Sequence, residues 1–326
     1  MILVTGATGF LGSELCKQLA SRGMACKALK RNTTSIPSQL LSLASIEWID
    51  GSLLEPESLS KLMEDVDQIY HCSAMVSFGE EDEHEMLRYN VVGTKNLVNI
   101  CLSRNISLLH VSSVATLEAA DQKGITDESN FPNTLPQTHP YGVSKYLSEL
   151  AVLEGMKQGL QAIVVNPSII LGFIQNCSGS GAFFKTIYKG LTFYPIGGAG
   201  FVAVEDVAKC MIELIQLKKF GERYIISSEN LSYKDLFTEI AQGLNRKAPT
   251  LKVGKLGMIA AGYLFVFLAK LLNKKPLITK ETAKSSSNLS RYSNTKITTE
   301  TGVQLQKIRP YIQSLSPTYL TTLTNV

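Results

Sequence analysis

Short apolar runs alternate with longer segments of helical periodicity through the first half of the chain. The short runs have the length and composition of buried strands, whereas the longer segments have the apolar spacing of helices. Strands and helices that alternate in this way form parallel βαβ units, so the pattern predicts an α/β fold with a doubly wound parallel sheet and helices on both faces. The predicted strands are 2–4, 25–29, 46–49, 67–72 and 108–111, and the predicted helices are 13–22, 53–63, 84–104 and 139–158.

Three glycines follow the first predicted strand in the spacing T-G-x-x-G-x-x-G. Gly6 fits a tight turn with positive φ, Gly9 lets the backbone approach a pyrophosphate, and Gly12 lets the helix pack closely on the strand. The amino terminus of the following helix adds free N–H groups and the positive end of its dipole. The stretch therefore predicts a Rossmann-type dinucleotide site, the alternative being a glycine-rich turn that binds nothing.

The end of the second predicted strand carries Lys30 and Arg31 and no acidic residue. At this position in dinucleotide-binding folds an acid binds the ribose 2′-hydroxyl of NAD, whereas an arginine accommodates the 2′-phosphate of NADP. We therefore expect NADP(H) to be preferred over NAD(H). The alternative is that both basic side chains simply face solvent.

A serine, a tyrosine and a lysine follow in an arrangement that fits proton and hydride transfer. The fifth predicted strand ends on Ser112 and Ser113, at the sheet edge where such folds bind ligands. Tyr141 and Lys145 lie four residues apart in a predicted helix and share one face of it. A nearby ammonium favours a phenolate, so Lys145 is expected to lower the pKa of Tyr141 toward neutral pH. Tyr141 would then exchange a proton with a substrate oxygen held by a serine, while a nicotinamide exchanges hydride.

The chain resembles the extended short-chain dehydrogenase/reductases, the superfamily of NAD(P)-dependent sugar-nucleotide epimerases and dehydratases. Within it, the chain is most similar to the dihydroflavonol 4-reductase-like and 3β-hydroxysteroid-dehydrogenase-like proteins. The resemblance covers residues 1–250 and is weak beyond Leu251. It rests on VTGATGFLG (4–12), IYHCSAMVS (69–77), YNVVGTKNLV (89–98), HVSSVAT (110–116), YGVSK (141–145), VVNPSIILG (164–172), FVAVEDVA (201–208) and GERYIIS (221–227).

The resemblance implies a role for the residues of each motif. Ser113, rather than Ser112, would be the catalytic serine, Tyr141 the acid/base, and Lys145 a further ligand of the nicotinamide ribose. Asn90 would lie beside the cofactor phosphates or a structural water, and 166–168 would lie over the nicotinamide. With Arg31, the expected cofactor-binding residues are Gly6, Gly9, Phe10, Leu11, Gly12, Ser52, Leu53, Ala74, Asn90, Tyr141, Lys145, Asn166, Pro167 and Ser168.

Three positions depart from the family pattern. Gly51-Ser52-Leu53 replaces a frequent Gly-Asp-Leu, so the contact to the adenine amine is weakened or made by Ser52. Glu118 stands where plant dihydroflavonol reductases carry a flavonoid-binding asparagine, which argues against a flavonoid substrate. Gly172-Phe173 replaces a usual Gly-Pro and is expected to reshape the mouth of the substrate site.

Two domains are expected. Residues 1–170 would form the NAD(P)-binding domain, with 201–228 returning to it, whereas 171–200 and 229–326 would form a smaller α/β domain that binds substrate. The segment 172–200 is rich in glycine and serine and then in aromatic residues. This composition fits a mobile lid over an apolar pocket, and it also fits aromatic side chains that pack the core of the smaller domain.

Charge is distributed unevenly along the chain. Residues from Leu251 onward contain eleven Lys and Arg and only two acids, although the whole chain carries a net charge of +4. Such a basic end is either a solvated face or a surface for an anionic partner. Residues 256–269 are apolar but shorter than the ~20 residues that span a bilayer. We expect them to be buried or at a dimer contact, with peripheral membrane contact through 256–275 as the alternative.

The remaining composition is that of an ordinary globular protein, with 44% hydrophobic and 18% charged residues. The six cysteines have no metal-ligand spacing and the four histidines are isolated, so no metal site is expected. The first strand leaves no room for a signal peptide, and the scattered cysteines fit reduced thiols, which together favour a cytoplasmic location. We expect a small-molecule substrate and no nucleic-acid partner, and the resemblance implies a homodimer built on the helices at 84–104 and 141–158.

The leading hypothesis is an oxidoreductase that transfers hydride between NADP(H) and the carbonyl or alcohol of a small, fairly apolar substrate. One alternative is an NAD-dependent nucleotide-sugar epimerase or dehydratase, which uses the same three residues. Another is a non-catalytic NAD(P)-binding sensor or scaffold. The basic end of the second strand and the charge-poor segment 172–200 favour the reductase, and the intact Ser113, Tyr141 and Lys145 argue against the scaffold.

Overall fold

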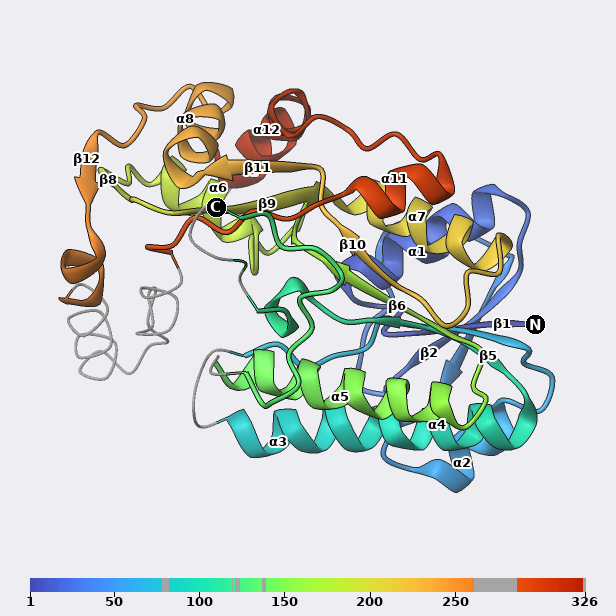
Figure 1. The fold of residues 1–326 in the computed structure, drawn as a ribbon. Helices are drawn as coiled ribbons and strands as arrows, with labels where there is room; N and C mark the ends of the chain where they lie inside the picture. Colours follow the sequence, from blue (N-terminus) through green and yellow to red (C-terminus); the bar gives the residue numbers. More distant parts are fainter. Residues whose placement is uncertain (78–81, 119, 121–123, 137–138, 261–285, 325–326) are drawn as a thin grey trace.

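A seven-stranded parallel sheet in the order β10-β6-β5-β4-β1-β2-β3 forms the centre of the molecule (Figure 1). The computed structural model describes residues 1–77, 82–118, 120, 124–136, 139–260 and 286–324. The predicted doubly wound sheet is confirmed, and the ends of its first five strands agree with the prediction to within one residue. The strands are β1 (Ile2–Thr5), β2 (Cys26–Lys30), β3 (Ile46–Asp50), β4 (Gln68–His71), β5 (Ser107–Val111), β6 (Ala162–Pro167) and β10 (Arg223–Ile226).

Helices cover both faces of this sheet (Figure 1). On one face lie α2 (Pro56–Leu62), α3 (Glu83–Leu87), α4 (Gly93–Arg104) and α5 (Pro140–Lys157), and on the other lie α1 (Phe10–Ser21), α7 (Val204–Gln216) and α11 (Thr295–Thr301). Each face has its own cluster of buried apolar side chains. The single helix predicted at 84–104 is interrupted by a π-helical turn, Arg88–Val92, between α3 and α4.

A smaller unit lies beyond the carboxyl ends of the parallel strands (Figure 1). It contains a three-stranded sheet in the order β11-β9-β7 and a β12-β8 pair. A third cluster of buried apolar side chains forms its core. The strands are β7 (Ile169–Leu171), β8 (Phe193–Pro195), β9 (Gly198–Ala203), β11 (Glu229–Ser232) and β12 (Leu251–Val253), and the helices are α6 (Gly181–Tyr188), α8 (Tyr233–Gly243) and α12 (Ile308–Thr324).

Aromatic side chains from the segment 172–200 pack this third core. Phe184 is fully buried and stacks on Tyr319 of α12, with the ring centroids 4.0 Å apart. Phe173 meets the same tyrosine edge-on at 5.2 Å, and the Tyr319 hydroxyl donates to the Gly172 carbonyl at 2.7 Å. Of the two interpretations of this segment, the structure supports aromatics that pack the smaller unit.

The apolar segment predicted at 256–269 lies mostly outside the described residues. Of its first residues, Leu256 is 84% exposed and Met258 is buried. Within the described ranges, no helix is both long and apolar enough to cross a bilayer.

The turn between β1 and α1 leaves no room for side chains. Gly6 adopts a φ of +69°, and a Cβ there would lie 2.7 Å from the Cα of Ser73. A Cβ on Gly12 would overlap the carbonyl oxygen of Gly6 and approach the Cα of Ala7 to 3.0 Å. The roles predicted for Gly6 and Gly12 are thus confirmed, because the first turn of α1 lies directly on the end of the glycine turn.

Gly12→Ala is expected to lower the free energy of unfolding by about 1–3 kcal/mol, because its Cβ meets backbone atoms that have to move. Gly254→Ala is the matched control, since a Cβ at that position meets no atom of the described residues within 4 Å. Urea unfolding followed by circular dichroism measures both variants. Equal stability of the two would contradict the close packing of α1 on the glycine turn.

Candidate active site

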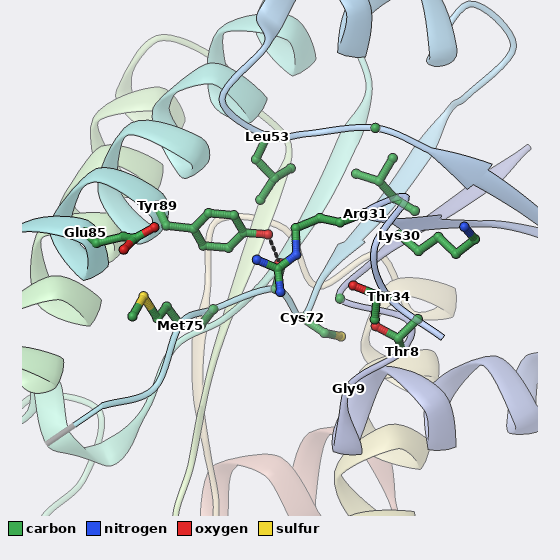
Figure 2. A pocket seen from close by; sticks show the side chains of 15 residues that line it. Thr8, Gly9, Lys30, Arg31, Thr34, Leu53, Cys72, Met75, Glu85 and Tyr89 are labelled. Carbon is green, nitrogen blue, oxygen red and sulfur yellow. Dashed lines mark hydrogen bonds between the residues drawn. The ribbon is translucent and has the colours of Figure 1, made fainter. Parts of the chain in front are cut away.

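A cavity of about 270 Å³ opens at the carboxyl ends of β1, β2 and β4 (Figure 2). The glycine turn forms one wall, and the segments that follow β2, β3 and β4 form the others. Its lining consists of Gly6, Thr8, Gly9, Leu29, Lys30, Arg31, Thr34, Gly51, Leu53, Cys72, Ser73, Ala74, Met75, Glu85 and Tyr89. The N-cap residue of α1 is Gly9, which has no side chain to cap the N–H groups of the first helical turn. A cavity of this kind suits a phosphate-bearing ligand.

Most of the cofactor-binding residues that the sequence predicts in the part of the chain before α3 line this cavity or lie beside it. Gly6, Gly9, Arg31, Leu53 and Ala74 line it, and Phe10, Leu11 and Gly12 form the first turn of α1 beside it. Ser52 is not among the lining residues, because its Oγ faces the backbone and accepts a hydrogen bond from the Leu54 N–H at 3.2 Å. The neighbouring Gly51 lines the cavity instead.

The two basic residues at the end of β2 have different surroundings. The Lys30 ammonium donates to Asp50 Oδ1 at 2.5 Å, and Figure 2 shows its side chain extending away from Tyr89. The Arg31 guanidinium instead lies 6.0 Å from the centroid of the Tyr89 ring, within the group of lining side chains (Figure 2). Both residues line the cavity, but the Lys30 ammonium is engaged by Asp50, whereas the Arg31 guanidinium lies beside Tyr89.

The side chains of Ser113 and Tyr141 interact, and the Ser113 hydroxyl lowers the pKa of the Tyr141 phenol by hydrogen bonding to it. Ser113 begins the short 3-10 helix Val114–Thr116, and its Oγ accepts from the Ala115 N–H at 3.1 Å. Tyr141 lies in the first turn of α5, where its ring stacks on that of the N-cap residue His139 at a centroid distance of 5.9 Å. Two separate helix starts thus bring the hydroxyl groups of Ser113 and Tyr141 together.

Lys145 lies one turn after Tyr141 and is buried, with 2% of its surface exposed. Its ammonium donates to the Val111 carbonyl at 2.5 Å, at the end of β5. Burial lowers the pKa of Lys145 to about 8, and the Glu149 carboxylate partly offsets that effect.

The predicted lowering of the Tyr141 pKa is wrong for this structure. Burial raises the pKa of Tyr141 to about 12, and the hydrogen bond with Ser113 opposes that rise only in part. Desolvation of the phenolate outweighs the favourable effect expected of an ammonium. At neutral pH Tyr141 is therefore a protonated phenol.

The two serines that follow β5 have different partners. The Ser112 hydroxyl is buried and donates to Glu149 Oε2 at 2.5 Å, whereas Ser113 faces Tyr141. This difference favours Ser113 as the serine able to meet a substrate.

The expected cofactor residues Asn90, Asn166 and Ser168 are buried and bind other parts of the protein. Asn90 Oδ1 accepts from the Met75 N–H at 2.7 Å, and its Nδ2 donates to Ser144 Oγ at 2.9 Å. Asn166 Nδ2 donates to the Ser113 carbonyl at 3.1 Å. Ser168 follows Pro167, the last residue of β6, and its N–H donates to the Ile226 carbonyl at 3.0 Å. These side chains hold the segments around the site and do not line the described cavity.

Sequence reasoning missed several residues of the site. Thr34 and Tyr89 line the cavity. The buried Glu149 forms an ion pair beside Ser112 with the partly exposed Arg223, whose Nε donates to Glu149 Oε1 at 2.6 Å. Only Glu149 had a signal in the sequence: it lies four residues after Lys145 and so on the same face of the helix.

Comparisons with known proteins agree with this geometry. The family described as "NAD dependent epimerase/dehydratase family" matches residues 2–227. A putative dihydroflavonol 4-reductase from Synechocystis is 26% identical over 313 residues, which cover 94% of this chain and 90% of that protein.

Solved structures share the whole fold. The crystal structure of gox2253 has a TM-score of 0.85 and 29% identity and covers 98% of both chains. The dTDP-glucose 4,6-dehydratase of Bacillus anthracis, solved in complex with NAD, has a TM-score of 0.77 and 16% identity and covers 98% of this chain and 96% of its own. The glycine turn, the Ser113–Tyr141 contact and these matches together show that the chain belongs to the NAD dependent epimerase/dehydratase family and is an oxidoreductase of the short-chain dehydrogenase/reductase type.

Proposed function

We propose that this protein is an NADP(H)-dependent reductase that acts on the carbonyl group of a small, fairly apolar substrate. The interaction between the Ser113 and Tyr141 side chains, with Lys145 one turn further along α5, is the observation that carries the proposal. In this proposal both hydroxyl groups bind one substrate oxygen.

The residues around the cavity fit a nicotinamide dinucleotide. The positive φ of Gly6 and the close packing at Gly12 hold the amino terminus of α1 at the cavity, where its N–H groups suit a pyrophosphate. Leu53, Ala74 and Tyr89 offer apolar and aromatic surface on the other walls. When bound, the cofactor supplies the hydride for reduction or accepts it in the reverse reaction.

The protonation state of Tyr141 favours reduction. With a pKa of about 12, Tyr141 holds its proton at neutral pH and can donate it to the oxygen of a carbonyl as negative charge develops there. Ser113 holds the same oxygen through its hydroxyl group. Lys145, which is buried near the site, provides positive charge that stabilises the phenolate after the proton has left.

We infer a preference for NADP(H) from the Arg31 guanidinium and the Thr34 hydroxyl, which line the same part of the cavity at the end of β2. A guanidinium and a hydroxyl are suitable donors to a 2′-phosphate.

A fairly apolar carbonyl substrate agrees with the name of one relative, a putative dihydroflavonol 4-reductase. Glu118 is exposed, and a carboxylate there argues against a flavonoid for this chain. The six cysteines are free thiols, and from them we infer a reducing compartment, the cytoplasm.

Replacing Tyr141 with phenylalanine is expected to lower kcat by about a hundredfold or more, because the proton donor is lost while the ring remains. The assay follows NADPH absorbance with benzaldehyde and cyclohexanone as carbonyl probes. NADPH fluorescence is expected to show unchanged cofactor binding. Turnover of UDP-glucose in the presence of NAD+, without net reduction of that cofactor, would instead support the epimerase alternative. Full activity of the phenylalanine variant would contradict the catalytic role.

Arg31→Ala is expected to weaken NADPH binding about tenfold or more, because it removes a charge-assisted hydrogen bond, while NADH binding changes little. Lys30→Ala is the comparison, since its ammonium is committed to Asp50 and its loss should affect NADPH far less. Fluorescence titration measures the affinities of both variants and of the wild type for NADPH and for NADH. An equal loss of affinity for NADH and NADPH in Arg31→Ala would contradict the proposed 2′-phosphate contact.

We also propose a homodimer through the layer formed by α3, α4 and α5. Two apolar side chains in this layer are exposed, Val92 by 45% and Leu150 by 37%. Sedimentation velocity is expected to find a dimer for the wild type and weaker association for Leu150→Glu. A wild-type protein that is monomeric at all concentrations would contradict the proposed dimer.

A further inference from the structure

Glu149 of α5 is a fully buried carboxylate with four hydrogen-bond donors. Its Oε2 accepts from Ser112 Oγ at 2.5 Å and from Thr116 Oγ1 and Asn166 Nδ2, each at 3.0 Å. Its Oε1 accepts from Arg223 Nε at 2.6 Å. Its side chain is 0% exposed. One carboxylate therefore connects α5 to β5, β6, β10 and the short 3-10 helix.

The donors to Glu149 Oε2 surround Ser113. Ser112 precedes it. Asn166 Nδ2 also donates to the Ser113 carbonyl, at 3.1 Å. The single hydroxyl proton of Thr116 is shared between Glu149 Oε2 and the Ser113 carbonyl, whose oxygen lies 2.9 Å from Thr116 Oγ1. Because Tyr141 is on the same helix as Glu149, the carboxylate holds the Ser113 turn to the element that carries Tyr141. The Ser113–Tyr141 contact thus depends on Glu149 through three short links.

Arg223 supplies the opposite charge from β10. Besides its bond to Glu149, its guanidinium lies 4.0 Å from the centroid of the Phe131 ring, and its Nη1 lies 3.5 Å from the Glu128 carbonyl. The ion pair therefore also anchors the segment between the 3-10 helix and α5. Because Glu149 is fully buried, loss of Arg223 would leave a buried charge without its ion-pair partner, which is costly.

Glu149 also acts on Lys145, one helical turn away. In the described part of the chain, the other titratable groups that interact electrostatically with Lys145 are His71 at the end of β4, Cys72 just after it, and His110 from β5. Burial lowers the pKa of both histidines and raises the pKa of Cys72 to about 12, so these three are uncharged at neutral pH. Tyr141, four residues before Lys145 on α5, is a protonated phenol at the same pH. The carboxylate is the charge that offsets the burial of the Lys145 ammonium.

We propose that Glu149 is a positioning residue for hydride transfer, which holds the Ser113 turn against α5 and balances the charge of Lys145. This inference rests on the proposed function, since it assigns Glu149 an effect on the Ser113, Tyr141 and Lys145 site. Glu149 itself does not touch substrate or cofactor.

The test replaces Glu149 with glutamine and compares it with Glu213→Gln. Glu213 forms an ion pair with Arg22 at 2.9 Å between α7 and α1, on the opposite face of the sheet. Glu149→Gln is expected to lower kcat with the carbonyl probes by about tenfold to a hundredfold, with little change in NADPH affinity. In protein labelled with 13C at the lysine ε carbon, NMR is expected to show Lys145 titrating at lower pH. Glu149→Asp keeps the charge and should restore the titration in part, and Glu213→Gln should match the wild type.

Ser112→Ala and Thr116→Val test whether Glu149 acts by positioning the Ser113 turn or by its charge. They also test the proposal if Glu149→Gln does not fold. Each removes one donor and keeps the carboxylate, so kcat should fall severalfold while the Lys145 titration stays in place. Wild-type kcat in both variants, or in a folded Glu149→Gln, would overturn the proposal, as would an unmoved Lys145 titration in Glu149→Gln. Full activity of Tyr141→Phe would instead overturn the proposed function, while the Lys145 titration would still report on Glu149.

Discussion

Burial of charge at the carboxyl edge of the sheet is the constraint on which the site depends. Lys145 and Glu149 are removed from water, and each is retained in the folded protein by short hydrogen bonds. Moving an ion into a protein interior costs several kcal/mol unless partners compensate for the lost water. The partners here come from the ends of β5 and β6, from β10 and from the short 3-10 helix, so the same contacts that satisfy the charges also fix the position of Ser113.

The parallel sheet makes this arrangement available. The parallel strands all end at one edge of the sheet, and the helix that follows a strand begins at that edge. At β1 the edge carries the glycine turn and the cavity, whereas at β5 and β6 it carries Ser113 and Asn166. The cavity that suits the dinucleotide and the hydroxyl pair that suits its chemistry are therefore neighbours because of topology.

Features encoded over a few neighbouring residues could be predicted from the sequence. The strand pattern and the roles of Gly6 and Gly12 depend on local spacing, and the structure confirms them. The direction in which the Tyr141 pKa shifts could not be predicted, because the shift depends on how deeply tertiary packing buries the phenol. The orientation of Ser52 toward the backbone could not be predicted either, since only the three-dimensional structure shows that Gly51, and not Ser52, faces the cavity. Glu149 could have been recognised by its spacing from Lys145, but its partner Arg223 is 74 residues away.

A reductase of the proposed kind passes hydride from a nicotinamide cofactor to a carbonyl, and the hydride remains in the product. The most direct measurement uses NADPH that carries deuterium at the transferable position of its nicotinamide, with benzaldehyde and cyclohexanone as acceptors. A parallel reaction contains UDP-glucose and NAD+, the oxidised cofactor that an epimerase or dehydratase needs. Mass spectrometry of the products is expected to find the deuterium in the alcohol, with NADPH consumed in equal amount. An altered nucleotide sugar, formed while the cofactor is unchanged at the end of each turnover, would contradict the claim and assign the site to epimerase or dehydratase chemistry.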